Sequence, residues 1–307
     1  MSKVKILITG GTGFLGYHLA KKCLKRNWIV HSLSTKKPNK IRKIKKVKYL
    51  TCDISKNYLL KKKINDNYDY VVNFAGYVDH TNKSKTMDSH YEGCRNLAQI
   101  FLKKKIKKFI QIGSCIEYGK IRSPQIEDKV SKKKILSTYG QAKLYSTNFL
   151  LDLHKRFKFP VVILRLYLVY GPYQDPNRLI PFTILNSILG KEFNCSEGKQ
   201  FRDFLYIDDF VEGLIKVLKK TSLSGEIINI GRGKPIKVKD VISKISQIVS
   251  TGKPNFGAIK LRKDEIKKLY PDISKAKKLL NWKPKIDINS GLNKTINFYR
   301  KKNYTKD

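Results

Sequence analysis

Three side chains of this sequence have the types and spacing for acid–base chemistry at a hydroxyl or keto group. Tyr139 and Lys143 lie four positions apart, which puts phenol and ammonium on one face of a helix. We expect Lys143 to stabilise the phenolate and so to lower the pKa of Tyr139 towards neutrality, making it a usable acid or base. Ser114 directly follows an apolar strand at residues 109–113, and its hydroxyl would hold the reacting oxygen against the phenol. Taken alone in so lysine-rich a chain, the Tyr–Lys pair could also be a surface tyrosine with a chance neighbour.

The start of the chain reads as a strand, a glycine-rich turn and a helix in immediate succession. Residues 4–8 are an apolar, β-branched run typical of a buried parallel strand, and residues 17–24 have helical spacing. Between them, Gly10 can take the tight turn, Gly13 lets a pyrophosphate approach the backbone, and Gly16 lets helix and strand pack closely. The free N–H groups at the helix N-terminus favour phosphate. We therefore predict a bound dinucleotide, while a P-loop is excluded because no Gly-Lys-Ser/Thr follows.

The end of the second strand bears on which dinucleotide is bound. A NAD-binding unit has Asp or Glu there to hold the ribose 2′-hydroxyl. Here the strand at residues 28–33 is followed by Ser34-Thr35-Lys36-Lys37. The Ser34 hydroxyl and the Lys36 ammonium would bind a 2′-phosphate, so we expect NADP to be preferred over NAD. A solvated lysine pair is the alternative.

Two further strand ends are candidates for the cofactor site. Asp53, after a short strand at residues 47–51, could accept a hydrogen bond from the adenine amino group or cap the next helix. The strand that begins at residue 70 ends in Phe74-Ala75-Gly76. Its small residues would let the cofactor lie close over the carboxyl end of the strand, where ligands collect in open α/β sheets.

Composition indicates a folded protein of a reducing compartment. The chain has 307 residues, of which 41% are hydrophobic, enough to bury a substantial core. Its five cysteines are scattered and show no CxxC spacing, which argues against disulfides and zinc sites, so we expect no metal and a cytoplasmic location. Cys115 is expected to be a small buried thiol. We expect no transmembrane segment and no signal peptide, because the first strand begins at Val4.

The formal charge of +41 would ordinarily suggest nucleic acid or an anionic surface. The basic residues are mostly Lys and are spread through almost every predicted helix and loop, without the interleaved aromatics that a base-stacking surface requires. We interpret them as solvated helix faces and expect no specific nucleic-acid partner. The positive field would still help to capture a doubly anionic substrate.

A series of motifs runs along nearly the whole chain in a specific order. They are Thr9 to Gly16, Asp53-Ile54, Ser114 before Tyr118-Gly119, Tyr139 with Lys143, Arg165 with Tyr170-Gly171-Pro172, residues 202–209, Asn229-Ile230-Gly231, residues 262–265 and 272–276, and Trp282-Lys283-Pro284. In these motifs the sequence resembles an extended short-chain dehydrogenase/reductase of the nucleotide-sugar epimerase/dehydratase group. The resemblance implies an α/β fold with a Rossmann-type doubly wound parallel sheet and a smaller α/β C-terminal substrate domain. We expect residues 1–165, completed by segments within 204–231, to bind the dinucleotide, and residues 166–307 to bind mainly the substrate, interleaved with the core.

The same resemblance implies roles for individual residues. Ser114, Tyr139 and Lys143 would form the catalytic triad, with Lys143 also reaching the nicotinamide ribose. Arg202 and Arg262 would bind the pyrophosphate of a nucleoside-diphosphate sugar, and Glu265 (or Asp264) the nucleotide ribose. The expected cofactor contacts are Gly10, Gly13, Phe14, Leu15, Gly16, Ser34, Lys36, Asp53, Ile54, Phe74, Ala75, Gly76, Tyr139 and Lys143.

The sequence leaves two partners of Arg202 possible, and the resemblance adds an expectation about assembly. The planar guanidinium of Arg202 suits phosphate, although an ion pair with Asp203 is an alternative. The family also implies a homodimer through the helices that bear Gly93 and Tyr139.

Several positions depart from the family pattern. His90 stands where the family usually has Asn, and Leu168 replaces an Asn that commonly contacts the substrate, so we expect an altered sugar pocket. Family members that dehydrate the sugar usually have an acidic pair right after the Ser or Thr. Here Cys115 and Ile116 occupy those places and Glu117 is displaced by one, which disfavours dehydration.

The resulting hypothesis is an NAD(P)-dependent oxidoreductase acting at C4 of a nucleoside-diphosphate hexose. It would be a 4-ketoreductase or a 4-epimerase of deoxysugar or surface-polysaccharide precursor synthesis, and the last segments show some likeness to 4-ketoreductases of the CDP-abequose synthase type. The alternatives are a 4,6-dehydratase, or a non-catalytic dinucleotide-binding regulator or RNA-associated relative.

Overall fold

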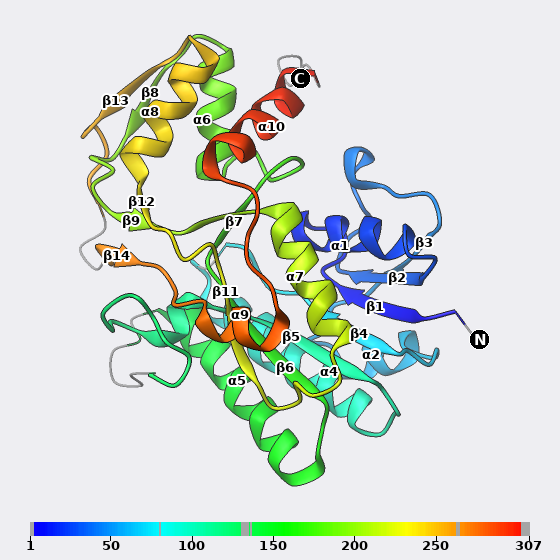
Figure 1. Cartoon of the computed structure of the whole chain (residues 1–307). Coiled ribbons are helices and arrows are strands. Elements are labelled where there is room, and N and C mark those ends of the chain that lie inside the picture. Colours follow the sequence, from blue (N-terminus) through cyan, green and yellow to red (C-terminus); the bar gives the residue numbers. More distant parts are fainter. Residues whose placement is uncertain (1–2, 80, 130–134, 136, 262–264, 302–307) are drawn as a thin grey trace.

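The computed structural model describes residues 3–79, 81–129, 135, 137–261 and 265–301. Within these residues the central element is a seven-stranded parallel sheet in the order β11-β6-β5-β4-β1-β2-β3 (Figure 1). The strands are β1 (Lys5–Thr9), β2 (Ile29–Ser34), β3 (Val47–Thr51), β4 (Tyr70–Asn73), β5 (Lys108–Ser114), β6 (Val161–Leu166) and β11 (Ile227–Ile230). The strand order reverses at β1, and in sheets of this kind ligands bind outside the carboxyl ends of the strands at that point.

Helices cover both faces of the sheet. One set is α1 (Phe14–Leu24), α7 (Ile207–Lys219) and α9 (Ser274–Leu280), and the other is α2 (Asn57–Lys63), α4 (Gly93–Leu102) and α5 (Thr138–Phe157). Successive side chains of a strand point to opposite faces, so Ile6 and Ile8 pack with the first set and Leu7 with the second. Burial on both faces is the reason that the central strands β1, β4 and β6 are largely apolar, whereas the edge strand β3 is half-exposed. A short helix, α3 (Lys83–Met87), and a π-helical turn (Asp88–Glu92) lead into α4.

The remaining elements form a smaller lobe, seen above the sheet in Figure 1. Its helices α6 (Leu179–Ile188), α8 (Val238–Val249) and α10 (Ile288–Lys301) pack against one another, and β8 (Glu192–Cys195) pairs with β13 (Lys253–Phe256). Between lobe and sheet lie the paired strands β7 (Leu168–Tyr170) and β10 (Phe204–Tyr206), and a small sheet of β12 (Ile236–Lys237), β9 (Phe201–Arg202) and β14 (Lys268–Leu269).

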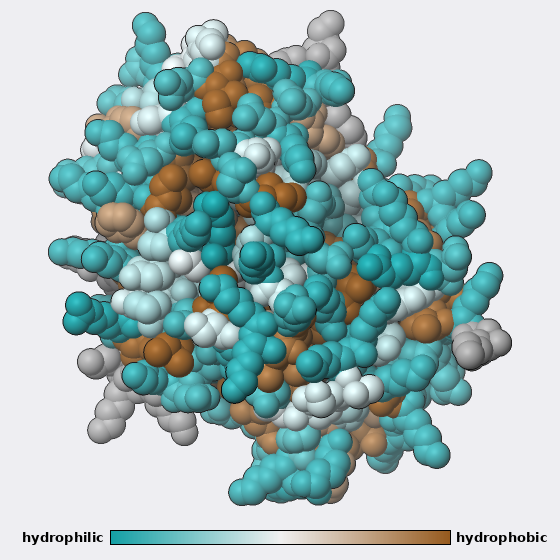
Figure 2. Space-filling model, viewed as in Figure 1, coloured by the Kyte–Doolittle hydropathy of each residue, from teal (hydrophilic) through white to brown (hydrophobic). Residues whose placement is uncertain are grey.

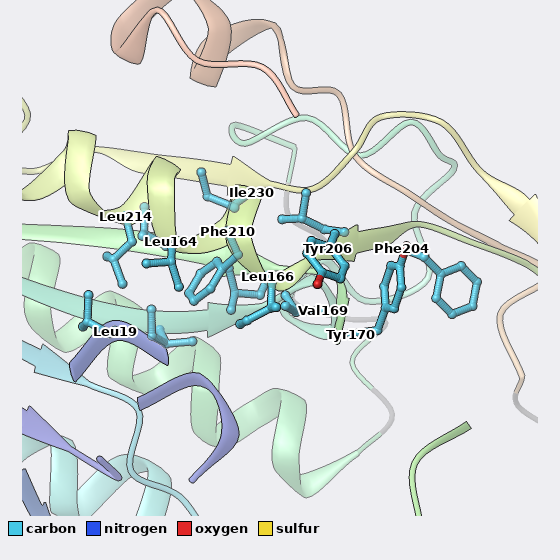
Figure 3. Packing of buried hydrophobic residues seen from close by; sticks show 14 of the residues in the cluster. Leu19, Leu164, Leu166, Val169, Tyr170, Phe204, Tyr206, Phe210, Leu214 and Ile230 are labelled. Carbon is cyan, nitrogen blue, oxygen red and sulfur yellow. The ribbon is translucent and has the colours of Figure 1, made fainter. Parts of the chain in front are cut away.

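One hydrophobic core joins the sheet to this lobe. Figure 3 shows Leu164 and Leu166 of β6 with Phe210 of α7, and the same packing continues to the rings of Tyr170 and Tyr206. These side chains are almost completely buried. The small lobe is therefore packed onto the central sheet rather than tethered to it.

The structure confirms the fold class predicted from the sequence. The strands expected at residues 4–8, 28–33, 47–51 and 109–113 are present as β1, β2, β3 and β5, with bounds within one residue of those expected. Strand β11 lies at the edge of the central sheet, after the first segments of the lobe along the chain. The domain boundary at residue 165 stays a prediction.

The surface is dominated by polar side chains. Figure 2 shows hydrophilic residues over most of the visible face, with small separate hydrophobic areas among them. In the part of the chain that the structure describes, no helix combines the length and apolar character needed to cross a membrane.

Candidate active site

The glycine-rich turn between β1 and α1 brings three strand ends together. Gly10 has φ of +68°, its N–H donates to Leu33 O at 2.8 Å, and a Cβ at this position would lie 2.9 Å from the carbonyl carbon of Phe74. Gly16 packs just as tightly, because a Cβ there would lie 2.5 Å from the Cα of Gly11. A Cβ on Gly13, in contrast, would meet only Gly10 O, at 3.2 Å. Glycine at position 10 is thus required by the turn, and at position 16 by the close approach of α1.

The N-terminus of α1 is suited to an anion. Its N-cap residue is Gly13, no side chain caps it, and the first turn has no acidic residue. The helix dipole and free N–H groups at this end therefore meet no negative side chain of the helix itself. The cradle left open at Gly13 and this helix end fit the pyrophosphate of a dinucleotide.

A cavity of about 1000 Å³ opens beside this turn. Of the predicted cofactor contacts, its walls include Gly10, Gly13, Ser34, Lys36, Asp53, Ile54, Phe74, Ala75 and Gly76. Phe14 and Leu15 pack instead against the hydrophobic core, and Gly16 packs on the turn. The side chains of Phe14 and Leu15 and the backbone of Gly16 thus support the site from behind, and the roles of these three residues as cofactor contacts stay predictions.

One corner of the cavity, at the ends of the neighbouring strands β2 and β3, has two lysines and the carboxylate of Asp53 in its wall. The exposed Lys36 lines it, and so does Lys56, which the sequence reasoning did not single out. The hydroxyl of Ser34 accepts a hydrogen bond from Thr12 N–H at 3.3 Å. The Asp53 carboxylate accepts one from Ser55 N–H at 2.9 Å, so it stabilises a turn rather than acting as the N-cap of α2. Lys56 could have been predicted as part of the cavity wall only from the fact that β2 and β3 are neighbours in the sheet.

Ser114, Tyr139 and Lys143 meet at the carboxyl end of β5. Ser114 is the last residue of that strand, and Tyr139 and Lys143 lie in the first two turns of α5. The ammonium of Lys143 is 5.9 Å from the centre of the Tyr139 ring and donates to Ile112 O at 2.7 Å. The predicted catalytic residues are therefore brought together.

Gly140 sets the distance between α5 and the turn after β5. A Cβ on Gly140 would lie 2.9 Å from Cγ2 of Ile116, so this turn of the helix approaches closely only because residue 140 is glycine. The side chain of Ser137 caps the helix by accepting from Gly140 N–H at 3.1 Å. Both residues lie in the stretch around Tyr139. The cap by Ser137 is local, whereas the spacing that Gly140 allows depends on a tertiary contact with Ile116.

The expected lowering of the Tyr139 pKa is wrong for this structure. Burial raises the pKa of Tyr139 to about 12, and a hydrogen bond with Ser114 and the charge of Arg178 lower it only in part. Burial also lowers the pKa of the Lys143 ammonium. Desolvation thus outweighs the effects of Ser114 and Arg178 on the pKa of Tyr139, and the side chain is a neutral phenol near pH 7.

Glu117 has both carboxylate oxygens occupied by protein partners. Oε1 accepts from Ser114 N–H at 2.7 Å, and Oε2 accepts from Thr147 Oγ1 at 2.8 Å and from Arg165 Nε at 3.0 Å. The Glu117 side chain is fully buried. The Cys115 thiol is buried as well, and burial raises its pKa to about 12. Glu117 therefore holds the loop behind Ser114 and does not face a substrate.

The predicted substrate ligands partly pair with one another. Arg202 forms an ion pair with Glu265 and donates to Ile266 O at 2.8 Å. The alternative pairing of Arg202 with Asp203 is wrong, because the Asp203 carboxylate accepts from Arg232 N–H and Gly233 N–H, both at 2.7 Å. Arg262 and Asp264 lie outside the described residues. The roles of Arg202 and Glu265 in substrate binding stay predictions.

Arg202 and Glu265 belong to the same neighbourhood as the catalytic residues. Ile266 packs with Cys115 in a small hydrophobic cluster, and the positive charge of Arg202 acts on the Cys115 thiol. The ion pair thus lies beside the turn that follows Ser114. A substrate spanning from this pair to Tyr139 would cross the end of β5.

The two departures from the family pattern differ in exposure. Leu168, at the start of β7, is 42% exposed. His90, in the π-helical turn, is buried, and its ring makes an edge-to-face contact with Tyr139 at 4.9 Å between centroids. The phenol of Tyr139 therefore has an imidazole as its neighbour.

Metal chemistry has no obvious place among the described residues. In these segments no three His, Cys, Asp or Glu side chains are grouped so as to hold a metal ion. The donor set of the site is instead hydroxyl, phenol, ammonium and backbone N–H, which fits an organic dinucleotide and a phosphorylated substrate.

Comparison with known proteins gives a consistent assignment. The model of the "NAD dependent epimerase/dehydratase family" matches residues 6–231. UDP-glucuronate 4-epimerase of Thermodesulfobacterium geofontis is 29% identical, with 95% of both chains covered. Human dTDP-D-glucose 4,6-dehydratase is 28% identical, covering 96% of this chain and 90% of the relative.

Solved structures agree. UDP-glucuronic acid 4-epimerase of Bacillus cereus, in complex with UDP-glucuronic acid and NAD, superposes with a TM-score of 0.86 at 28% identity, covering 97% of this chain and 99% of that one. UDP-glucose 4-epimerase of Thermotoga maritima, at 24% identity and the same coverage, has a TM-score of 0.91 and shares the fold.

Proposed function

Because the chain belongs to the NAD dependent epimerase/dehydratase family, an extended short-chain dehydrogenase/reductase group, we propose that it acts at C4 of a nucleoside-diphosphate hexose. The leading candidate reaction is 4-epimerisation, and 4-ketoreduction is the second. The observation that supports C4 chemistry most directly is the convergence of Ser114, Tyr139 and Lys143 at the end of β5. The side chain of His90 lies between the site and the nucleotide cavity: it contacts the Tyr139 ring on one side and, on another, Gly76, which lines the cavity.

Each residue has a distinct task in this proposal. A bound nicotinamide dinucleotide supplies the hydride chemistry. The Ser114 hydroxyl holds the C4 oxygen against the phenol of Tyr139, which takes or gives the proton at that oxygen. Lys143 is held by Ile112 O and keeps its ammonium behind the phenol. The guanidinium of Arg202 suits the two phosphates of the substrate, whose correct placement fixes the sugar for reaction.

The two candidate reactions differ in the order of proton transfers at Tyr139. In epimerisation Tyr139 must first lose its proton. As phenolate it takes the proton of the C4 hydroxyl, while the C4 hydride would pass to the bound dinucleotide. After the keto-sugar has turned over in the pocket, the hydride would return to its other face and the tyrosine gives the proton back to the oxygen. In ketoreduction the tyrosine only gives a proton to the keto oxygen. Burial raises the pKa of Tyr139 to about 12, and the neutral phenol is the form that gives a proton, as ketoreduction requires.

Dehydration at C5–C6 fits the site less well, although one relative is named as a 4,6-dehydratase. That reaction needs an acid and a base next to the Ser or Thr. Glu117 is buried and paired with Arg165, and the Cys115 thiol is protonated. Neither side chain is therefore available for elimination.

We propose NADP as the preferred cofactor. The supporting observation is the cavity corner lined by Ser34, Lys36 and Lys56, without a carboxylate at the end of β2. A 2′-phosphate would meet two ammonium groups there, whereas Asp or Glu would repel it. The variant Ser34→Asp is expected to lower the NADP-over-NAD preference in kcat/KM by roughly 10- to 100-fold. An unchanged preference would show that this corner does not read the 2′-position.

The function is tested by incubating the protein with UDP-, dTDP- and CDP-hexoses and separating the products by anion-exchange chromatography. Interconversion of C4 epimers without added cofactor indicates an epimerase, and consumption of NADPH with a 4-keto-sugar indicates a ketoreductase. Tyr139→Phe is expected to lower kcat by about 10²- to 10⁴-fold. The matched control is Tyr145→Phe, an exposed tyrosine on the same helix. Equal turnover by wild type and Tyr139→Phe would refute the mechanism.

The assembly and location remain part of the proposal. A homodimer through the outer faces of α4 and α5 is checked by sedimentation at several protein concentrations. The cytoplasmic location stays an expectation from cysteine usage.

A further inference from the structure

The imidazole of His90 is enclosed on three sides. Its Nε2 lies 3.1 Å from Tyr77 O, and because a carbonyl only accepts, Nε2 is the protonated nitrogen of this contact. On a second side its ring meets the ring of Tyr139, with an interplanar angle of 74°. The third side is the backbone of Gly76. His90 is therefore a spacer of fixed orientation between the end of β4 and the catalytic phenol.

The contact with Gly76 leaves no room for a side chain. A Cβ at position 76 would lie 1.9 Å from Cε1 and 2.4 Å from Nδ1 of His90. The ring could yield only by leaving Tyr77 O or by pushing against Tyr139. Glycine at position 76 is thus a requirement of histidine at position 90.

The turn that bears His90 is also fastened to the catalytic helix. Ser146 Oγ of α5 donates to His90 O at 2.7 Å. Tyr139 and Ser146 therefore contact the same residue, one through its side chain and the other through its backbone. A displacement of His90 would therefore change its contacts with α5 at both Tyr139 and Ser146.

We propose that His90 is a positioning residue for Tyr139 and that Gly76 and His90 form a matched pair that sets the angle of the catalytic phenol. The inference rests on the proposed function in assigning the proton transfer to Tyr139. The asparagine expected here from the family resemblance has no ring to face the phenol, so His90 makes a contact with Tyr139 that an asparagine could not make. Because the edge-to-face arrangement is directional, loss of the ring changes the orientation of the phenol and not only its packing.

The experiment is a double-mutant cycle with Gly76→Ala, His90→Asn and the combination of both, in the full chain with its cofactor. His90→Asn is expected to lower kcat by about 10- to 100-fold with KM and cofactor Kd nearly unchanged, because misorientation affects the reacting geometry. Gly76→Ala is expected to lower kcat at least as much. In the double variant the asparagine leaves space for the new Cβ, so kcat should recover at least about tenfold relative to Gly76→Ala alone.

Two further variants keep the test decisive. His90→Gln offers an amide donor to Tyr77 O without a ring, and its kcat should fall with that of His90→Asn even if one of them folds poorly. Glu92→Gln changes a half-buried residue of the same π-helical turn, paired with Arg95, and should leave kcat unchanged.

The proposal is overturned if His90→Asn or a folded His90→Gln keeps the wild-type kcat, or if the effects of Gly76→Ala and His90→Asn simply add. It is equally overturned if KM or cofactor Kd, rather than kcat, accounts for the loss. A failure of the proposed function looks different, because Tyr139→Phe would then retain turnover whatever residue 90 is.

Discussion

Glu117 has a side chain that could act as an acid or base, but in this structure it serves a structural role. Its carboxylate is fully buried, and the buried guanidinium of Arg165 lies 3.0 Å away and also stacks on the Tyr118 ring at 4.4 Å. Removing one partner of such a pair leaves an uncompensated charge in the interior. The ion pair therefore belongs to the support of Ser114.

Glu117→Gln is expected to lower the free energy of unfolding by about 3–5 kcal/mol, because Arg165 loses its counter-charge while remaining buried. The measurement is urea unfolding near pH 7. The control, Asp152→Asn, removes an exposed carboxylate that pairs with Arg156, and should change stability by less than about 0.5 kcal/mol. Full stability of Glu117→Gln together with lost turnover would instead assign Glu117 a direct part in the reaction.

Arg202 is predicted to act on substrate affinity rather than on the chemical step. Arg202→Ala should raise KM for the nucleoside-diphosphate sugar by about 10- to 100-fold with little change in kcat, since a charged hydrogen bond to phosphate is lost. Steady-state kinetics measure both quantities. Lys199→Ala, an exposed lysine just before β9, serves as the control for lost positive charge. A fall in kcat alone would contradict a role in binding the pyrophosphate.

At the residue level, local patterns predicted more than distant contacts. The spacing of Tyr139 and Lys143 is a property of one helix, and the position of Ser114 follows from one strand, so both could be read from the sequence. The pairing of Arg202 with Glu265 joins residues far apart in the chain, and the sequence did not reveal it. The raised pKa of Tyr139 depends on burial by several elements, and for this reason the expectation from Lys143 alone was wrong.

Among the elements, the turn after β11 depends on a carboxylate from another strand. Asp203 is fully buried just before β10, and its two oxygens accept from Arg232 N–H and Gly233 N–H. Gly231 is needed for this approach, because a Cβ there would lie 2.8 Å from Asp203 Oδ1. One carboxylate thus organises the turn that leads from the sheet into the small lobe.

Asp203 should make stability depend on pH in an unusual direction. Burial raises its pKa from 3.8 to about 6, so between these values the folded protein holds a proton that the unfolded chain has released. The contribution of Asp203 to the free energy of unfolding therefore falls as pH rises through this window, by up to about 3 kcal/mol. Asp203→Asn lacks this titration.

The measurement is urea unfolding of wild type and Asp203→Asn at several pH values from about 4.5 to 7. Stability of the wild type relative to the variant should decline across the series. A relative stability that rises with pH would mean that the backbone donors outweigh burial.

Most elements of the sheet could be predicted because each is a short apolar run bounded by glycine or polar residues. Strands β8 and β13 could not, because they are two short segments far apart in sequence that exist only as a pair. The π-helical turn before α4 was likewise invisible, since its sequence continues the helical pattern on either side. Tertiary pairing, rather than local preference, decides these segments.

For the whole molecule, the formal charge of +41 should act on the rate of substrate capture. The exposed lysines are spread over the surface, so the field is general and is screened by salt. Between about 20 and 300 mM salt, we expect kcat/KM for a nucleoside-diphosphate sugar to fall several-fold while kcat stays constant. Sucrose at matched osmolarity is the control, and a parallel fall of kcat would contradict a field effect.

The salt dependence of nucleic-acid binding tests the other consequence of the positive charge. Binding of a labelled oligonucleotide, followed by fluorescence anisotropy, is expected to weaken steeply with salt and to show no sequence preference. Salt-resistant, sequence-dependent binding would revive the RNA-associated alternative.

Strand β11 closes the free edge of β6 only after the polypeptide has left the sheet and formed the first segments of the small lobe, α6 and β8. In β11, Asn229 Oδ1 accepts a hydrogen bond from the Tyr118 hydroxyl at 2.6 Å. This bond connects the last strand to the turn behind Ser114. A fragment cut at residue 165 would expose β6 and leave that tyrosine without its acceptor. Neither half should be obtainable as an autonomous folding unit, so splitting the gene at this point would give two insoluble products unless they were produced together.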